Sequence, residues 1–232
     1  MSRRGLVDEA VSSILERIAD GTFSVAEPLP PEADLALLLD VSRPTMREAV
    51  RTLSDRGILN VVHGRGTFVA ERSEWRDLPT LIDLMARELP EEELGLQLTQ
   101  VRRMIEVGAC GLAATNRTEE DLAAMRVALE RYDVASAADD VEGTVRFDIA
   151  FHDAILVASG NPFLATIMQP LAEALYTSRR ITSSRREVRD RAQSHHRRIL
   201  AQLERGDSVG AKEAMRAHMS QTRDDFETRK PR

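Results

Sequence analysis

The sequence is poor in cysteine, in aromatic residues and in long apolar runs, and each shortage excludes a class of protein. Cys110 is the single cysteine, which excludes an intramolecular disulfide framework and fits a reducing cytoplasm. Aromatic residues make up 4%, too few for a protein that binds single-stranded nucleic acid by base stacking. Apolar runs such as Leu35–Leu39 are too short to cross a membrane, and the first residues lack the apolar core of a signal peptide. We therefore expect a cytoplasmic protein without a membrane segment.

The remaining composition is that of an ordinary globular chain. Of its 232 residues, 42% are hydrophobic and 30% are charged, and the net charge is −6. This length predicts one or two domains, each large enough to bury a core. Net acidity argues against indiscriminate binding to nucleic acid, although it leaves room for a small basic face.

The first part of the chain combines three helix patterns with a hairpin pattern. The helices are expected at residues 6–20, from about residue 32, and at 43–56. Ser42 is placed to cap the third helix, and Gly57 is placed to end it. Two β-rich runs then flank the letters HGRG, which is typical of a hairpin. Three helices followed by a hairpin predict a winged helix-turn-helix over residues 1–72.

The expected third helix carries two separate stripes. Apolar side chains form one stripe, and Arg43, Arg47 and Arg51, spaced four residues apart, form another. With the apolar stripe packed inward, the arginines face outward, where a helix in the major groove can contact guanine edges or phosphates. His63 and Arg65 lie at the hairpin tip, where a wing reaches the adjacent groove or backbone. A solvated charged face is the alternative for an arginine row alone, but the cap, the stripe and the basic tip in this order favour a face that reads DNA.

These residues resemble the winged-helix domain of the GntR family of bacterial transcription regulators. The resemblance rests on Leu29, Pro30 and Glu32, on the letters VSRPTMREAVRTL, and on GRGTFV in the expected wing. It covers about residues 6–70. It implies that the following residues contact DNA, as the matching positions do in FadR-like members: Arg43, Thr45, Arg47, His63, Gly64 and Arg65. Asp40 stands where a turn glycine is usual, and aspartate accepts left-handed geometry better than most residues.

The rest of the chain predicts helices alone. Residues 73–93 form a charged linker with a short amphipathic segment that ends at Pro90. Residues 94–228 show five or six helices, with breaks at NRTEED, SAADD, SGNP, TSSRRE and ERGDS. We therefore expect an all-α bundle with short connections, so that the whole protein is mainly α.

Several inward positions of this bundle carry polar side chains that suit a metal. Asp148 and His152 lie near the apolar stripe of one helix, and His218 lies on the inward side of the last helix. Either His195 or His196 faces inward from a third helix, and periodicity does not settle which. Three imidazoles and one carboxylate suit Zn²⁺, Ni²⁺, Mn²⁺ or Fe²⁺. Each histidine alone is more often a hydrogen-bonded core residue, but four inward ligand types together favour a metal site.

Arg102 lies at the edge of the inward stripe of the first bundle helix. An inward arginine opposite a metal can clamp a carboxylate ligand, since its planar group binds carboxylates through two hydrogen bonds. A buried pair with Glu106, four residues further on, is an equally good interpretation of the spacing.

The helical part resembles the FCD ligand-binding domain of the FadR-like regulators. The letters that carry the resemblance are VRRMIEVGACGLAA, FDIAFHDAILVASGNPFL, SHHRRILAQLERGD and AKEAMRAHM, in this order over most of residues 94–228. The resemblance implies Asp148, His152, His196 and His218 as metal ligands, with His196 rather than His195, and Arg102 as the clamp for an effector carboxylate.

The expected function is a regulator of transcription rather than an enzyme. We expect a homodimer, most simply a repressor, that binds a palindromic double-stranded operator and responds to a small organic acid at a divalent metal site, most simply zinc. One alternative keeps DNA binding but makes the metal purely structural. A second alternative is a metallohydrolase, which would need a general base near the metal, and no further inward Glu or Asp is evident.

Overall fold

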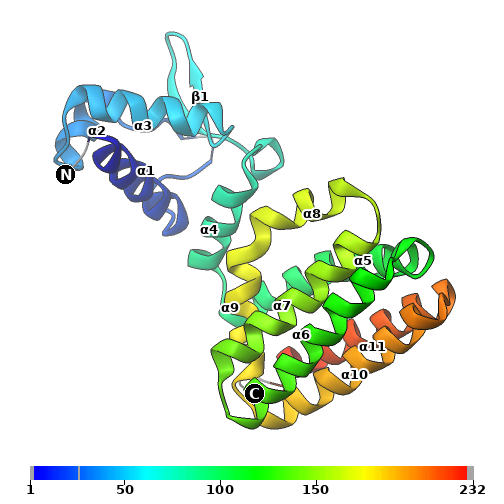
Figure 1. Ribbon diagram of the computed structural model, residues 1–232. Coiled ribbons are helices and arrows are strands. Elements are labelled where there is room, and N and C mark those ends of the chain that lie inside the picture. The colour runs from blue at the N-terminus through cyan, green and yellow to red at the C-terminus, as the bar shows by residue number, and fades with distance from the viewer. Residues whose placement is uncertain (1–2, 26, 229–232) are drawn as a thin grey trace. The chain divides into compact units, whose positions relative to one another are not determined.

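The computed structural model describes residues 3–25 and 27–228, and the chain divides into two compact units, Met1–Leu89 and Pro90–Arg232. Figure 1 labels their helices and strands. Each unit has its own buried apolar cluster.

Unit 1 combines helices with one hairpin. Its elements are α1 (Arg3–Ala19), α2 (Glu32–Leu38), α3 (Arg43–Asp55), β1 (Leu59–Val62), β2 (Gly66–Val69), the 3₁₀ turn η1 (Arg72–Glu74) and α4 (Leu78–Glu88). Strands β1 and β2 are antiparallel, with Leu59 opposite Val69 and Val62 opposite Gly66. The winged helix-turn-helix expected from the sequence is confirmed, each element lying within a few residues of its predicted range.

The core of unit 1 explains why these segments fold as they do. Ile14 of α1 and Met46, Ala49 and Leu53 of α3 are fully buried in one cluster, so α3 turns its apolar stripe inward. The turn between α2 and α3 contains Asp40 at φ +50°, the left-handed geometry expected for this position. The orientation of α3, and with it the direction of its arginines, is thus set by apolar packing.

Helix α4 belongs to unit 1 and packs on α1. Its most buried side chains are Thr80 and Leu84, whereas Leu78, an apolar residue at its first position, is exposed. Arg56 donates a hydrogen bond to Thr80 Oγ1 (3.1 Å). Tertiary contacts with α1 therefore select a face of α4 that its short apolar pattern does not predict.

Unit 2 is built from helices throughout its described part. Its elements are α5 (Glu91–Asn116), α6 (Glu119–Ala137), α7 (Val141–Ala158), α8 (Pro162–Met168), the 3₁₀ turn η2 (Gln169–Leu171), α9 (Ala172–Ser183), α10 (Arg186–Arg205) and α11 (Ser208–Glu227). Figure 1 shows the long helices α5, α6, α7, α10 and α11 running alongside one another, and each packs on at least two of the others. The all-α bundle and its five predicted breaks are confirmed.

The expected number of five or six bundle helices is wrong. The described residues of unit 2 form seven α-helices, because α8 and α9 are separated by η2. Pro170 lies inside that turn, where it lacks the backbone N–H that a continuous helix would use. The extra break turns the chain so that α9 packs against α5 and α7, and this places α9 beside the polar centre of the bundle.

Candidate DNA-reading face and buried histidine cluster

Helix α3 begins with the cap that its sequence predicts. Ser42 has an extended backbone, and its Oγ accepts a hydrogen bond from the Thr45 amide (3.2 Å). Pro44 occupies the first turn, where a missing N–H costs nothing. Gly57, just beyond the helix, has φ +75°, and a Cβ there would lie 2.9 Å from the Glu74 carbonyl oxygen. Only glycine therefore fits this position, and α3 ends there.

The outward stripe of α3 is exposed as predicted. Arg43, Arg47 and Arg51 are all exposed, on the side opposite the buried Met46 and Leu53. Arg47 Nε lies 3.2 Å from Glu32 Oε2, and Arg51 lies 4.0 Å from Glu48 and 3.8 Å from Asp55. Exposed ion pairs are weak, so each guanidinium group can leave its carboxylate and bind another anion.

Thr45 is placed differently from the arginines. It is only 6% exposed, and its hydroxyl shares a hydrogen bond with Ser42 Oγ (2.7 Å). A side chain held in this way supports the cap and lies off the outward stripe. Within the structure the Thr45 side chain therefore supports the start of α3, and its contact with DNA stays a prediction from the resemblance.

The hairpin tip is exposed and basic. His63, Gly64 and Arg65 are all exposed, and Gly64 has φ +74°, which glycine adopts without steric cost. The Arg65 guanidinium lies 6.0 Å from the centre of the Phe68 ring. The tip therefore projects a histidine and an arginine from a turn that is tight because of its glycine.

In unit 2 the structure brings together the four polar residues that the sequence singled out. His152 of α7, His196 of α10 and His218 of α11 are buried, and they offer nitrogen atoms within 4.8 Å of one another. His196 Nε2 lies 3.3 Å from His218 Nε2. Asp148 Oδ1 lies 3.3 Å from His196 Nε2 and 3.9 Å from His152 Nε2. This set, named here the histidine cluster, consists of Asp148, His152, His196 and His218.

The neighbouring residue His195 lies outside this cluster. It is partly exposed, whereas His196 is 0% exposed and packs edge-on against the ring of Tyr132. The helix turns its side chains by about 100° per residue, so only one of two adjacent histidines can face the centre. The structure resolves the ambiguity that periodicity left open.

Two side chains outside the cluster orient its imidazoles. Glu106 Oε2 lies 2.7 Å from His152 Nδ1, and Gln193 Oε1 lies 3.2 Å from His196 Nδ1. The Gln193 amide donates to the Leu129 carbonyl (2.9 Å) and to Asp133 (3.0 Å), which turns its oxygen toward His196. Holding Nδ1 in this way points each Nε2 lone pair into the cluster.

Burial and neighbouring charges keep Asp148, His196 and His218 in the protonation states that metal ligands need. Burial lowers the pKa of His196 to about 3 and holds the pKa of His218 well below its usual value. Burial by itself would raise the pKa of Asp148, but the Arg179 guanidinium and other nearby groups outweigh it and lower that pKa to about 2. Neutral imidazoles and an ionised carboxylate can all donate electron pairs to a cation.

Arg102 is placed both to pair with Glu106 and to reach the edge of the histidine cluster, the two positions that its sequence spacing allowed. It is 4% exposed, and its Nε lies 2.7 Å from Glu106 Oε1, which is the buried pair. Its Nη2 also lies 3.3 Å from His152 Nε2, at the edge of the histidine cluster. Arg102 holds the pKa of Glu106 well below its usual range, against the effect of burial.

At this site Arg179 escaped the sequence analysis, and Glu106 entered it only as a possible buried partner of Arg102. Glu106 is 2% exposed, so the expectation that no further acidic residue faces inward is wrong; pairing with Arg102 makes its burial tolerable. Arg179 of α9 is 7% exposed, and its Nε lies 2.5 Å from Asp148 Oδ2. Arg179 follows the buried Leu175 by four residues, and this spacing was the one signal that could have placed it inward.

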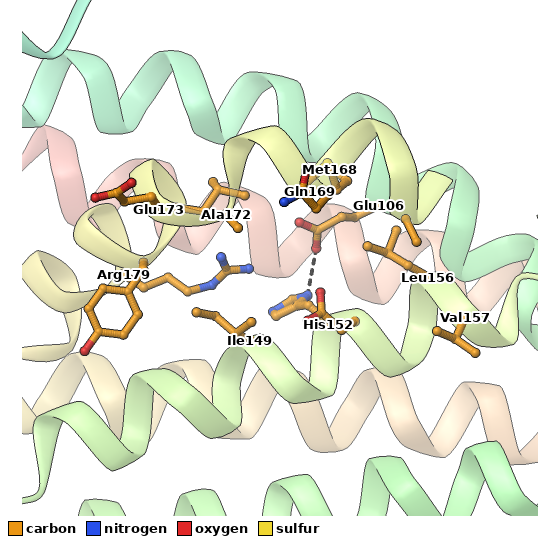
Figure 2. A pocket seen from close by; sticks show the side chains of 14 residues that line it. Glu106, Ile149, His152, Leu156, Val157, Met168, Gln169, Ala172, Glu173 and Arg179 are labelled. Carbon is orange, nitrogen blue, oxygen red and sulfur yellow. Dashed lines mark ion pairs between the residues drawn. The ribbon is translucent and has the colours of Figure 1, made fainter. Parts of the chain in front are cut away.

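A cavity of about 600 Å³ adjoins the histidine cluster between α5, α7, α8 and α9. Figure 2 shows the Glu106 carboxylate and the His152 ring facing each other, with the Arg179 guanidinium directed toward them. Apolar side chains make up most of the remaining wall, including Ile149, Leu156 and Met168. The cavity therefore has one polar end, beside the cluster, and an apolar body.

Comparison with known proteins assigns the chain to a family. Residues 6–69 match the model described as bacterial regulatory proteins, gntR family, and residues 97–221 match the FCD domain. The chain is 31% identical over 212 residues to the HTH-type transcriptional regulator LutR of Bacillus subtilis, covering 89% of this chain and 94% of LutR. It is 27% identical over 213 residues to the galactonate operon transcriptional repressor of Escherichia coli, covering 89% and 90% of the two chains. Among solved structures, a GntR protein of Streptococcus agalactiae is similar, with 26% identity, a TM-score of 0.52, and coverage of 94% of this chain and 99% of that one.

The chain therefore belongs to the GntR family, and an FCD domain follows its winged helix-turn-helix in the sequence. It is a DNA-binding regulator of transcription and not an enzyme, which removes the metallohydrolase alternative. No helix of the described residues is long and apolar enough to span a membrane.

Proposed function

We propose that this regulator binds a palindromic operator as a homodimer and that a small carboxylate, bound beside a divalent metal ion in unit 2, controls the binding. The observation that carries the proposal is the convergence of three buried histidine nitrogens and Asp148 Oδ1 at one point of the bundle. A core has no packing reason to gather four such groups, since unsatisfied buried polar atoms cost free energy.

The residues of the histidine cluster fit a metal ion. His196 Nε2 and His218 Nε2 face each other at 3.3 Å, and His218 Nδ1 has no hydrogen-bond partner among the described residues. Three imidazoles with one carboxylate suit zinc best among common ions, and nickel, manganese or iron also accept this set. Asp148, His152, His196 and His218 would hold the ion, and a five- or six-coordinate ion would still have a position for an anionic ligand.

The charges around the cluster favour a carboxylate as that ligand. Arg102 and Arg179 balance Glu106 and Asp148, so the buried charged side chains cancel before any ion binds. A divalent cation then leaves positive charge in a buried site, and an anion offsets it. Arg102 Nη2, beside His152, is placed to contribute to binding that anion.

The DNA contacts are proposed for the exposed basic side chains of unit 1. Arg43, Arg47 and Arg51 would read the major groove from α3, while the hairpin tip with His63, Gly64 and Arg65 would contact the adjacent groove or backbone. Two copies related by a two-fold axis would then recognise a palindrome. Such a protein acts where the bacterial chromosome lies, in the cytoplasm.

We propose that the protein represses transcription when bound to its operator and that the effector releases it from the DNA. A relative of this chain is named a repressor of a galactonate operon, and galactonate is itself a carboxylate. The physical mechanism is a population shift: a carboxylate that binds one arrangement of the protein more tightly moves the equilibrium toward it, by no more than that difference in affinity.

Metal content tests the site directly. Purified wild-type protein is expected to retain a divalent ion after dialysis, measured by inductively coupled plasma mass spectrometry, and His196→Ala is expected to lose it. His195→Ala is the matched control, because its imidazole lies one position away and outside the cluster. Equal metal content in wild type and His196→Ala would refute the site.

Thermal unfolding with and without metal tests the effector. A carboxylate at 100 times its Kd should stabilise the metal-loaded protein by about 2.7 kcal/mol, a shift in Tm of roughly 2–4 °C for a protein of this size. The shift is expected to vanish when a chelator removes the ion. A metal that raises Tm without any carboxylate response would show a structural ion and overturn the sensing proposal.

A further inference from the structure

We infer that the effector is a monocarboxylate with an apolar body, whose carboxylate lies at Arg179 and whose body fills the cavity between α7, α8 and α9. This inference rests on the proposed carboxylate-sensing function and specifies its ligand class. It starts from the uneven polarity of the cavity, which is polar at the end beside the histidine cluster and apolar over most of its remaining wall.

The size of the cavity argues for more than a two- or three-carbon acid. Its volume of about 600 Å³ falls in the range of about 300–1,000 Å³ that is typical of sites for larger organic ligands. A very small acid would contact the polar end and leave the apolar walls to water. Leu156 and Met168 are buried residues of these walls, and an apolar ligand body would cover their remaining surface.

Arg179 is the anchoring cation because its terminal nitrogens have no hydrogen-bond or ion-pair partner among the described residues. Its Nε lies 2.5 Å from Asp148 Oδ2, and this ion pair holds the guanidinium beside the histidine cluster. Nη1 and Nη2 remain to donate to the two oxygens of a carboxylate, the geometry in which arginine binds such groups best. Arg102, by contrast, is engaged by Glu106 and is absent from the lining of this cavity.

The acidic residues of the wall argue against a second carboxylate on the ligand. Asp153 and Glu173 line the cavity, and neither has an ion-pair partner among the described residues. Glu173 points away from the polar end in Figure 2, so it lies toward the side where a distal carboxylate would come. The negative charge of Glu173 would repel a second carboxylate on that side, whereas an alkyl or aryl body meets no such penalty.

A homologous series of acids tests the inference on the metal-loaded full chain. Isothermal titration calorimetry with acetate, butanoate, hexanoate and octanoate is expected to show Kd falling about three- to fourfold for each buried methylene. Octanamide has the same shape without the charge, and we expect it to bind at least ten times more weakly than octanoate. Equal Kd values for acetate and octanoate would overturn the apolar body, and equal values for octanoate and octanamide would overturn the anchor.

A cavity-filling variant locates the binding. Ala172 is exposed and lines the cavity, so Ala172→Trp should occupy part of it without disturbing a buried core. The variant is expected to weaken octanoate at least tenfold while leaving acetate and metal content unchanged. Ala124→Trp, at an exposed position of α6 outside the cavity lining, is the control. Unchanged octanoate affinity in Ala172→Trp would contradict the assigned cavity.

Failure of this inference is distinguishable from failure of the proposed function. If acetate or lactate binds only with metal present, and affinity does not rise with chain length, carboxylate sensing stands and the apolar ligand class is refuted. If no acid binds to the metal-loaded protein, both the apolar ligand class and carboxylate sensing are refuted.

Discussion

Arginine side chains are exposed on α3 and buried at the centre of the helical bundle, although both sets form ion pairs. On α3, the side chains of Arg47 and its partner Glu32 are 78% and 39% exposed. In the bundle, the side chains of Arg102 and its partner Glu106 are 5% and 2% exposed. An exposed pair contributes about 0–1 kcal/mol, while breaking a buried pair costs about 3–5 kcal/mol.

This difference matches the task proposed for each region. A face that reads DNA must release its arginines from their own acidic neighbours and transfer them to phosphates or bases, so weak pairs suit it. A site that binds a small anion must hold its cations in place before the ligand arrives, so buried, fully paired charges suit it.

The largest effect is expected from Glu106→Ala. It leaves the Arg102 guanidinium buried without its carboxylate and removes the partner of His152 Nδ1, so we expect a loss of about 3–5 kcal/mol in the free energy of unfolding. Urea denaturation measures it. Glu106→Gln, which keeps the volume and one acceptor, should lose less. A loss below 1 kcal/mol in Glu106→Ala would show that the buried pair is no more important than the exposed one.

Arg47→Ala tests the exposed face. We expect a loss of about 1–3 kcal/mol in operator binding, with unchanged metal content and little change in stability. The operator would first be selected from randomised duplex DNA, and affinity measured by fluorescence anisotropy. Arg126→Ala removes a partly exposed arginine from unit 2, and it should leave operator affinity unaltered. Wild-type affinity in Arg47→Ala would refute the assignment of α3 as the recognition helix.

The buried thiol of Cys110 is expected to make the free energy of unfolding depend on pH. Burial raises the pKa of its thiol to about 12, above the value of about 8.5 for an unfolded cysteine. Between these values the unfolded chain releases the proton and the folded chain keeps it. The thiol therefore contributes stability that is fully present below about pH 8.5 and decreases by about 1 kcal/mol per pH unit above it.

The comparison of wild type with Cys110→Ala at pH 8 and pH 10 isolates this effect from other titrating groups. Wild type should lose more stability between the two values, and its thiol should resist Ellman's reagent in the folded state. Rapid labelling at pH 8 would contradict the burial of Cys110.

Ser42→Ala should have a smaller effect. The loss of the hydrogen bond from the Thr45 amide is expected to cost about 1 kcal/mol of stability in unit 1. Thermal unfolding followed by circular dichroism measures it, with Ser42→Asp, which can still cap, as the control. If Ser42→Asp loses as much as Ser42→Ala, capping is not the role of this residue.

Glu32→Gln is expected to have the smallest effect. Its pair with Arg47 is exposed, and so the free energy of unfolding should change by less than about 1 kcal/mol. A loss as large as that of Glu106→Ala would remove the contrast between the two regions.

The elements of the fold were predictable where local signals agree. Ser42, Pro44 and Gly57 mark the ends of α3 by their own backbone chemistry, and the five loop motifs of unit 2 all separate observed helices. The break at Pro170 was missed because the flanking residues continue an apolar pattern, and one proline amid such a pattern is compatible with a kink as well as an end.

The site was predictable in part, for a related reason. Asp148, His152 and His218 lie on apolar stripes, where a polar residue stands out. Glu106 entered the sequence analysis only as a possible partner of Arg102, and Arg179 did not stand out, because a single charged residue near a helix edge is usually solvated. Their burial depends on partners from other helices, and no pattern within one helix records those partners.

The sequence by itself determined the two units, the helices and hairpin of the first, and the residue types that could hold a metal. Periodicity and caps are local properties, and so they can be recognised before folding. Periodicity left the choice between His195 and His196 open, and the family resemblance favoured His196. The pairing of Arg179 with Asp148 and the apolar cavity beside them could be seen only in the tertiary structure. These features arise from side chains on helices distant in sequence, whose positions are set by the packing of the whole bundle.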